Sequence, residues 1–167
     1  MKKERSMKQL NVLMIAIIAL LSCLCMAGCG TDDIDISGYG EEKIVLSGLQ
    51  KEDVEVTIRE LAAMDCKTVK THSTSDKIGE VRATGVELGT LLEQYGLSKE
   101  DISSLRFYGI DEYDVPLTGE YIMEHDIYLA FGINGEPLDK ESAPCRVIIP
   151  ESDSAYWIRM VNRIEFN

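Results

Sequence analysis

The chain has 167 residues, of which 45% are hydrophobic and 28% charged, and its formal net charge is −12. This length fits one ordinary domain that can bury an apolar core. The acidic excess argues against nucleic-acid binding, since phosphates require clustered Lys and Arg. Five cysteines are too few for a disulfide-rich scaffold.

The first 28 residues have the pattern of a secretory signal. Four basic residues precede an apolar run over residues 10–21. As a helix this run is about 18 Å long, which is too short for the ~30 Å hydrocarbon core of a bilayer. It ends in Met26-Ala27-Gly28-Cys29, which resembles the bacterial lipobox.

This resemblance predicts cleavage before Cys29 and a diacylglycerol on its sulfur. An ordinary signal peptide followed by an incidental cysteine is the alternative. The mature chain keeps 13 basic and 28 acidic residues, a net charge of about −15. Because an anionic membrane surface repels such a domain, the lipid must hold it at the extracytoplasmic face of the cell membrane.

The mature chain divides into two parts. Residues 29–42 carry the lipidated Cys29 and an acidic, glycine-containing stretch, which predicts an extended and solvated tether. Residues 43–167 form the predicted domain, an α+β fold in which strands outnumber helices.

The expected strands cover residues 43–47, 54–56, 67–73, 79–83, 105–108, 113–115, 127–131, 146–149 and 156–166. Two capping boxes, Thr57–Glu60 and Thr84–Glu87, predict helices that continue to about residues 64 and 95. Gly96 is placed to end the second helix. Residues 98–101 and 121–124 predict two further short helical turns.

Six segments occur in the order found in one known family. They are Ile44–Gly48, Thr84–Glu93 (G-V-x-L-x-x-L-L), Phe107–Tyr113 (F-x-x-x-D-G-Y), Ala130–Leu138 (A-x-x-x-N-G-x-P-L), Pro144–Pro150 (P-x-R-L-V-V-P) and Trp157–Glu165. The chain thereby resembles the molybdopterin-binding domain of the sulfite oxidase-like oxidoreductases, in the compact form of many exported bacterial proteins. The resemblance covers residues 44–166.

The resemblance implies a sulfite oxidase-like fold with mixed sheets and a few short helices, and a molybdopterin cofactor that carries molybdenum. It places cofactor-binding residues at Arg146, Arg159, Asp111, Tyr113 and Asn134. Arginines in so acidic a chain suit bidentate anion binding, although pairing with surface acids is an equal alternative.

The departures from the family fall where the chemistry is expected. Active members ligate molybdenum with a Cys after the first internal strand, whereas this chain has Thr74-Ser75-Asp76 there. A Ser hydroxyl does not replace a soft thiolate. Glu112 and Glu151 replace family glycines, and their carboxylates would repel a cofactor phosphate.

Two cysteines remain as thiols in the mature chain, Cys66 and Cys145. Cys66 becomes the metal ligand only if the alignment is slipped by several residues. The other interpretations are a small buried side chain or a disulfide with Cys145. His72 and His125 lack the spacing of a metal pair and are expected on the surface.

Two functions from different classes follow. The first is a lipid-anchored molybdopterin-binding redox protein that works with membrane or secreted electron carriers. The second is a non-catalytic module of the same fold that binds a small anion or a partner protein. The missing ligand Cys favours the second, because a fold alone does not confer an activity.

Overall fold

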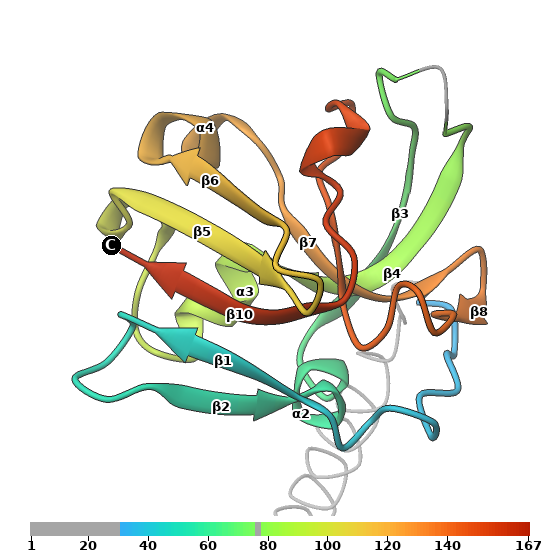
Figure 1. The fold of residues 1–167 in the computed structure, drawn as a ribbon, viewed down its shortest axis with the longest axis horizontal. Coiled ribbons are helices and arrows are strands. Elements are labelled where there is room, and N and C mark those ends of the chain that lie inside the picture. The colour runs from blue at the N-terminus through green and yellow to red at the C-terminus, as the bar shows by residue number, and fades with distance from the viewer. Residues whose placement is uncertain (1–30, 76–77) are drawn as a thin grey trace, which may run out of the picture.

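The structure is a computed structural model that describes residues 31–75 and 78–167 (Figure 1). The signal segment and Cys29 therefore lie outside the described residues. Two sheets make up most of the domain. Sheet A has the strand order β2-β1-β10-β5-β6, and sheet B has the order β3-β4-β7-β8, with β9 also paired to β7.

The strands of sheet A are β1 (Lys43–Ser47), β2 (Val54–Thr57), β5 (Ser104–Gly109), β6 (Asp114–Thr118) and β10 (Val161–Phe166). Those of sheet B are β3 (Cys66–Thr71), β4 (Val81–Glu87), β7 (Tyr128–Ile133), β8 (Glu136–Pro137) and β9 (Arg146–Ile148). The helices are α2 (Ile58–Ala62), α3 (Leu88–Glu93) and α4 (Gly119–Glu124), with 3-10 turns η1 (Lys99–Asp101) and η2 (Ser154–Tyr156). Mixed sheets with a few short helices confirm the predicted α+β class.

The main core lies between the two sheets. Phe107 on β5 and Ile164 on β10 are buried in one cluster with Leu129 on β7. Alternate residues of β7, Tyr128 and Ala130, point to the other face of sheet B and pack there in a second cluster with Trp157. Because both faces of β7 are covered, its sequence is apolar throughout rather than alternating.

One predicted capping box is present and the other is wrong. The Thr57 side chain accepts from the Glu60 backbone and the Glu60 carboxylate accepts from the Thr57 backbone, as expected. Thr84 instead lies inside β4, which continues to Glu87, and its hydroxyl bonds that of Thr68 on β3. The helix-capping pattern at Thr84 does not form a helix start because β4 pairs with both β3 and β7, and this pairing outweighs the local preference.

Gly85 shows how closely those strands approach. A Cβ at this position would lie 2.2 Å from the backbone oxygen of Leu129 on β7. The backbone shifts register here, between Thr84 and Gly85. The glycine therefore serves close strand packing rather than the start of a helix.

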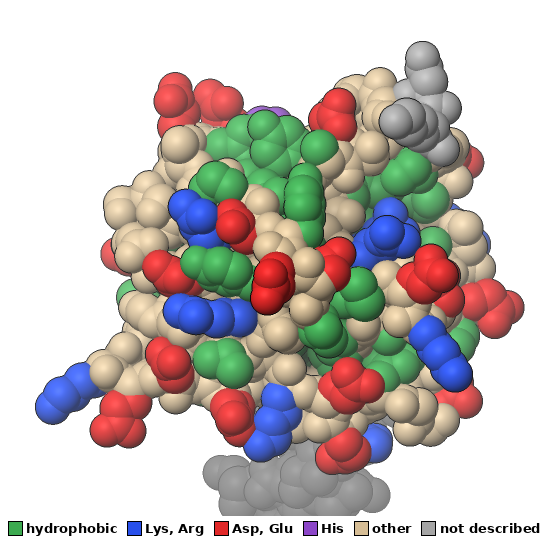
Figure 2. All heavy atoms as spheres, viewed as in Figure 1, with side chains coloured by type: hydrophobic (Ala, Val, Ile, Leu, Met, Phe, Trp, Pro, Cys, Tyr) green, Lys and Arg blue, Asp and Glu red, His purple; other side chains and the backbone are tan. Residues whose placement is uncertain are grey.

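The surface carries charges of both signs. Figure 2 shows acidic side chains scattered over the visible face, interspersed with Lys and Arg, rather than gathered in one patch. No helix among residues 31–75 and 78–167 is long and apolar enough to cross a membrane.

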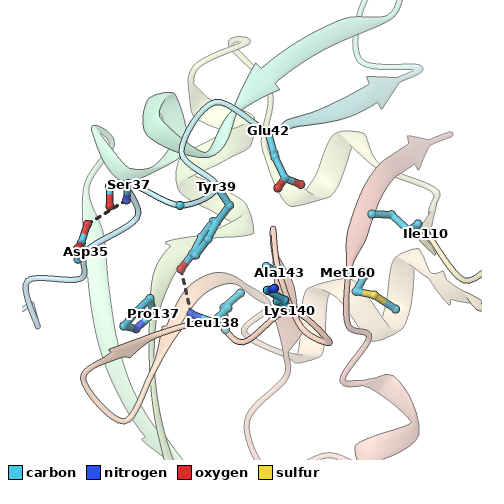
Figure 3. A pocket seen from close by; sticks show the side chains of 11 residues that line it. Asp35, Ser37, Tyr39, Glu42, Ile110, Pro137, Leu138, Lys140, Ala143 and Met160 are labelled. Atoms are coloured by element: carbon cyan, nitrogen blue, oxygen red, sulfur yellow. Dashed lines mark hydrogen bonds between the residues drawn. The ribbon is translucent and has the colours of Figure 1, made fainter.

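The solvated tether expected over residues 29–42 is wrong for its described part. Ile34 and Tyr39 are buried, 9% and 7% exposed, and both belong to the main core. The Tyr39 hydroxyl donates to the Phe131 carbonyl and accepts from the Leu138 backbone N–H at 3.0 Å (Figure 3). Ile34 and Tyr39 thus help to dock this acidic, glycine-containing stretch on the domain. We call residues 31–42 the strap.

Replacing Tyr39 with Phe is expected to destabilise the domain by about 1–3 kcal/mol, because two buried backbone groups lose their partner. Urea unfolding followed by fluorescence of Trp157, the single tryptophan, measures this. Tyr113→Phe is the matched control. Its hydroxyl is exposed, so its effect is expected to stay within about 0.5 kcal/mol. Equal effects of the two variants would contradict the docked strap.

Candidate functional site

A cavity of about 310 Å³ brings together three of the five residues expected at the cofactor site. Asp111 and Tyr113 line it from the β5–β6 turn, and Arg159 lines it from the segment after η2. Ser154, Ala155, Trp157 and Ile158 complete its wall. We call this the arginine cavity.

Local hydrogen bonds shape both walls of the arginine cavity. The Asp111 carboxylate accepts from the Tyr113 backbone at 3.2 Å, which closes the β5–β6 turn. The Asp153 carboxylate accepts from the Ala155 backbone at 2.8 Å and so caps η2. The Tyr113 hydroxyl donates to the Ala155 carbonyl at 3.1 Å and joins the two walls.

Arg146, the fourth expected residue, lies behind the same wall. Its guanidinium carbon is 5.9 Å from the ring centroid of Trp157, a cation–π distance. The indole N–H of Trp157 donates to the Ile149 carbonyl at 2.8 Å, which holds the ring in place. The sequence suggested Trp157 only as part of a motif; its role as the platform under Arg146 emerges from the fold.

The Arg146 side chain is not fully satisfied. Its Nε is buried and has no hydrogen-bond partner among the described residues. Burial lowers the pKa of Arg146, and repulsion from the Arg159 guanidinium lowers it further. Two arginines close enough to repel each other, one of them half-buried, make a local environment that favours an anion.

Arg159 is more exposed than Arg146. Its Nη1 is 3.7 Å from a Glu141 carboxylate oxygen, and its side chain is 51% exposed. An exposed pair of this length contributes little and leaves the guanidinium available. Arg159 can therefore turn to a bound anion at small cost.

Asn134, the fifth expected residue, does not line the arginine cavity. Asn134 and Gly135 have φ of 57° and 83° and form the tight turn between β7 and β8. Positive φ at both central positions is the type I′ hairpin geometry that Asn-Gly prefers. The Asn134 side chain accepts from the Arg82 backbone at 2.8 Å. The family motif here encodes a turn.

Glu112 and Glu151 stand where the family has glycines, and the backbone explains why. Their φ values are 65° and 57°, in the left-handed region that favours glycine. Each Glu costs about 1 kcal/mol in this conformation, which a glycine adopts without strain. Both side chains are exposed and neither lines the arginine cavity.

The loop after β3, where the family has its ligand cysteine, lies against the loop that leads into η2. The Ser73 hydroxyl donates to the Ser152 carbonyl at 3.1 Å, and the Thr74 backbone donates to the same oxygen at 2.9 Å. The Glu151 backbone donates to the Thr71 hydroxyl at 3.3 Å. These hydrogen bonds hold the loop in place, but its residues Ser73 and Thr74 carry hydroxyl groups and no thiol.

Neither thiol replaces the missing ligand. Cys66 begins β3, at the opposite end of the strand from this loop, and its thiol contacts the carbonyls of Leu61 and Ala62. Burial raises the pKa of Cys66 to about 11. Cys145 is buried in the main core, which also raises its pKa. Both are free thiols, so the disulfide between them is not formed.

The histidines do not form a metal site. His125 stacks on Tyr121, with ring centroids 3.9 Å apart, and His72 is exposed after β3. Within the described ranges no group of three or more His, Cys, Asp or Glu side chains is arranged to hold a metal ion.

A larger cavity of about 570 Å³ lies between the strap and the loop that follows β8 (Figure 3). Tyr39, Leu138 and Met160 provide apolar wall, while Glu42 and Lys140 add charge. None of the five residues expected from the sequence lines this cavity.

The comparisons with known proteins identify the family of the chain. The family described as oxidoreductase molybdopterin binding domain matches residues 34–167. The chain belongs to this family.

Among solved structures, the chain is similar to the sulfane dehydrogenase SoxCD from Paracoccus pantotrophus. The TM-score is 0.65 at 23% sequence identity, over 76% of this chain and 38% of that chain. At this identity the likeness establishes the fold, and the chain spans well under half the length of that protein. No curated protein sequence matches the chain.

The residues present do not fit a molybdenum centre held by a protein thiolate. The chain has no Cys between Cys66 and Cys145, so the loop after β3 offers no thiol. Neither remaining thiol lies at this loop, since Cys66 begins β3 at its opposite end and Cys145 is buried in the main core. What the site retains is the cavity that Arg159 lines and the neighbouring Arg146.

The protein, exported by a host that makes the molybdenum cofactor, is expected to contain far less than one molybdenum atom per chain. The physical reason is the absence of a thiolate at the ligand position. Elemental analysis of the purified protein measures this, and fluorescence of the oxidised pterin reports any cofactor without metal. Stoichiometric molybdenum that disappears in Cys66→Ser would contradict this expectation and make Cys66 the ligand.

Proposed function

We propose that this protein is an anion-binding module that has kept the family's pocket and lost its metal chemistry. The observation that carries the proposal is the buried Nε of Arg146, which has no hydrogen-bond partner among the described residues and belongs to the guanidinium over Trp157, a residue of the cavity wall. A buried donor on a charged group is costly without a partner. A bound anion supplies that partner.

The ligand class follows from the cavity. Its volume of about 310 Å³ is at the lower end of small-molecule sites. Planar guanidinium groups recognise phosphate and similar oxyanions by paired hydrogen bonds. A phosphate-bearing small molecule, of which a pterin phosphate is the example that the family suggests, or a free oxyanion fits these groups.

Molybdopterin-dependent redox turnover is the alternative that family membership supports. In that case electron carriers at the membrane or outside the cell are its partners. The donor set described above argues against it, since the ligand position carries Thr74-Ser75-Asp76 and no Cys. A partner protein in place of a small anion is the other form of the binding hypothesis. The small volume of the arginine cavity, which Arg159 lines, favours the small anion.

We also propose that the protein is lipidated on Cys29 and held at the extracytoplasmic face of the membrane. The support is the order of basic residues, apolar run and Met26-Ala27-Gly28-Cys29. A mature charge of about −15 gives no attraction to anionic lipids, so the anchor supplies the membrane affinity.

Arg146→Gln is expected to weaken binding of inorganic phosphate or a pterin phosphate at least tenfold, because a charge-assisted hydrogen bond contributes about 1.5–3 kcal/mol. Titration calorimetry measures the affinities of both ligands. Arg163→Gln is the matched control, since this exposed arginine on β10 pairs with Glu165 and lines neither wall. Equal affinities of the wild type and Arg146→Gln would sink the proposal.

Cys29→Ser is expected to abolish lipidation, because only a thiol accepts the diacylglycerol. Metabolic labelling with a radioactive fatty acid and detergent phase partitioning report the change. The variant is expected to appear unlabelled and in the aqueous phase. Labelling that survives the substitution would refute the lipobox interpretation.

A further inference from the structure

The strap is tied to the domain from its first described residues. The Asp32 backbone donates to the Thr68 hydroxyl on β3 at 3.0 Å. The Asp32 carboxylate accepts from the Arg82 guanidinium on β4 at 2.8 Å. Figure 1 shows this segment, in blue, beside the β8 end of sheet B. The chain is therefore held within three residues of Cys29.

Two further contacts lock the strap. Ile34 packs over Gly132 of β7, where a Cβ would lie 2.6 Å from the Ile34 Cγ1. The absent side chain of Gly132 makes the room that Ile34 fills. Tyr39 then bonds Phe131 and Leu138 in the core. Releasing Asp32 from the domain would require loss of these buried contacts as well.

The covalent chain limits how far the anchor can lie from this clamp. A polypeptide spans at most about 3.6 Å per residue, so Cys29 and Asp32 are no more than about 11 Å apart. A free tether over residues 29–42 would instead have a typical end-to-end distance of about 20 Å and would let the domain rotate. The docked strap therefore shortens the distance between the anchor and the domain and restricts the rotation of the domain.

We propose that the domain lies directly on the lipid bilayer, with the surface around Asp32 toward the headgroups. This surface comprises Asp32, Thr68, Arg82, Asn134 and Glu136, and we call it the Asp32 face. The proposal rests on the lipidation of Cys29 proposed above. It replaces a domain that tumbles on a tether with one held in a defined orientation.

The charges near the Asp32 face are only partly paired. Arg82 is paired with Asp32, and Lys70 on β3 is paired with Glu80 at 3.1 Å. Asp33 and Glu136 are exposed carboxylates without an ion-pair partner among the described residues. The lipid anchor and the docked strap, rather than attraction between charges, therefore have to hold this face at the headgroups.

The opposite end of the domain provides the contrast for a test. A compact domain of this size is roughly 35 Å across. Figure 1 shows α4 on the far side of the molecule from the blue strap. Glu120 on α4 and Glu136 on β8 are both exposed, so a probe on either leaves the core intact.

The test uses the lipidated full-length protein in phosphatidylcholine vesicles that contain a lipid with a nitroxide headgroup. A fluorophore is placed at Glu136→Cys or Glu120→Cys in a Cys66→Ser background, in which Cys145 is buried and Cys29 carries the lipid. Quenching by the nitroxide acts only at short range. We expect at least threefold stronger quenching at position 136 than at position 120.

A matched variant lengthens the chain between the lipidated Cys29 and the strap. Twelve Gly and Ser residues inserted between Gly30 and Thr31 add a typical span of about 19 Å and leave the strap unchanged. We expect this insertion to lower quenching at position 136 to the level at position 120. Equal quenching at the two positions without the insertion, in protein that floats with the vesicles, would overturn the proposed orientation while the anchor stands. Protein that does not float with vesicles would overturn the anchor and the orientation together.

Discussion

The double burial of β7 is the constraint on which the rest of the structure depends. One face of this strand packs into the main core between the sheets, and the other packs against Trp157. Its backbone pairs with β4, β8 and β9, and its Phe131 carbonyl accepts from Tyr39 of the strap. This strand, which has no solvent-facing side, therefore positions the main core, the Trp157 wall of the arginine cavity and the strap.

At the candidate site, the backbone conformation and the chemical identity of the side chains lead to different conclusions. Glu112 and Glu151 have positive φ, a backbone conformation that suits the glycines of the family motifs. The loop after β3 is held against Ser152, yet it carries no thiol where the family has its ligand cysteine. A pocket can retain its shape and its arginines after the group that ligates metal is gone, because shape depends on strand pairing and chemistry on single side chains.

Local rules succeeded where no tertiary contact competed with them. The Thr57–Glu60 capping box formed as predicted, and Gly96 has the positive φ expected at the end of a helix. The same pattern at Thr84–Glu87 failed, because pairing with β3 and β7 outweighed local helix preference. The strap was misjudged for a related reason, since its acidic composition concealed two residues, Ile34 and Tyr39, that fill the core.

The sequence by itself determined the family, the α+β class, most strands and the absence of a ligand cysteine, because these depend on residue identity and order. It also pointed to Asp111, Tyr113, Arg146 and Arg159, which the fold brings together. Only the tertiary structure decided that Asn134 belongs to a turn, that Cys66 and Cys145 stay apart, and that the strap is docked. These outcomes depend on contacts between residues far apart in the chain, and the spacing of side chains along a sequence does not encode such distances.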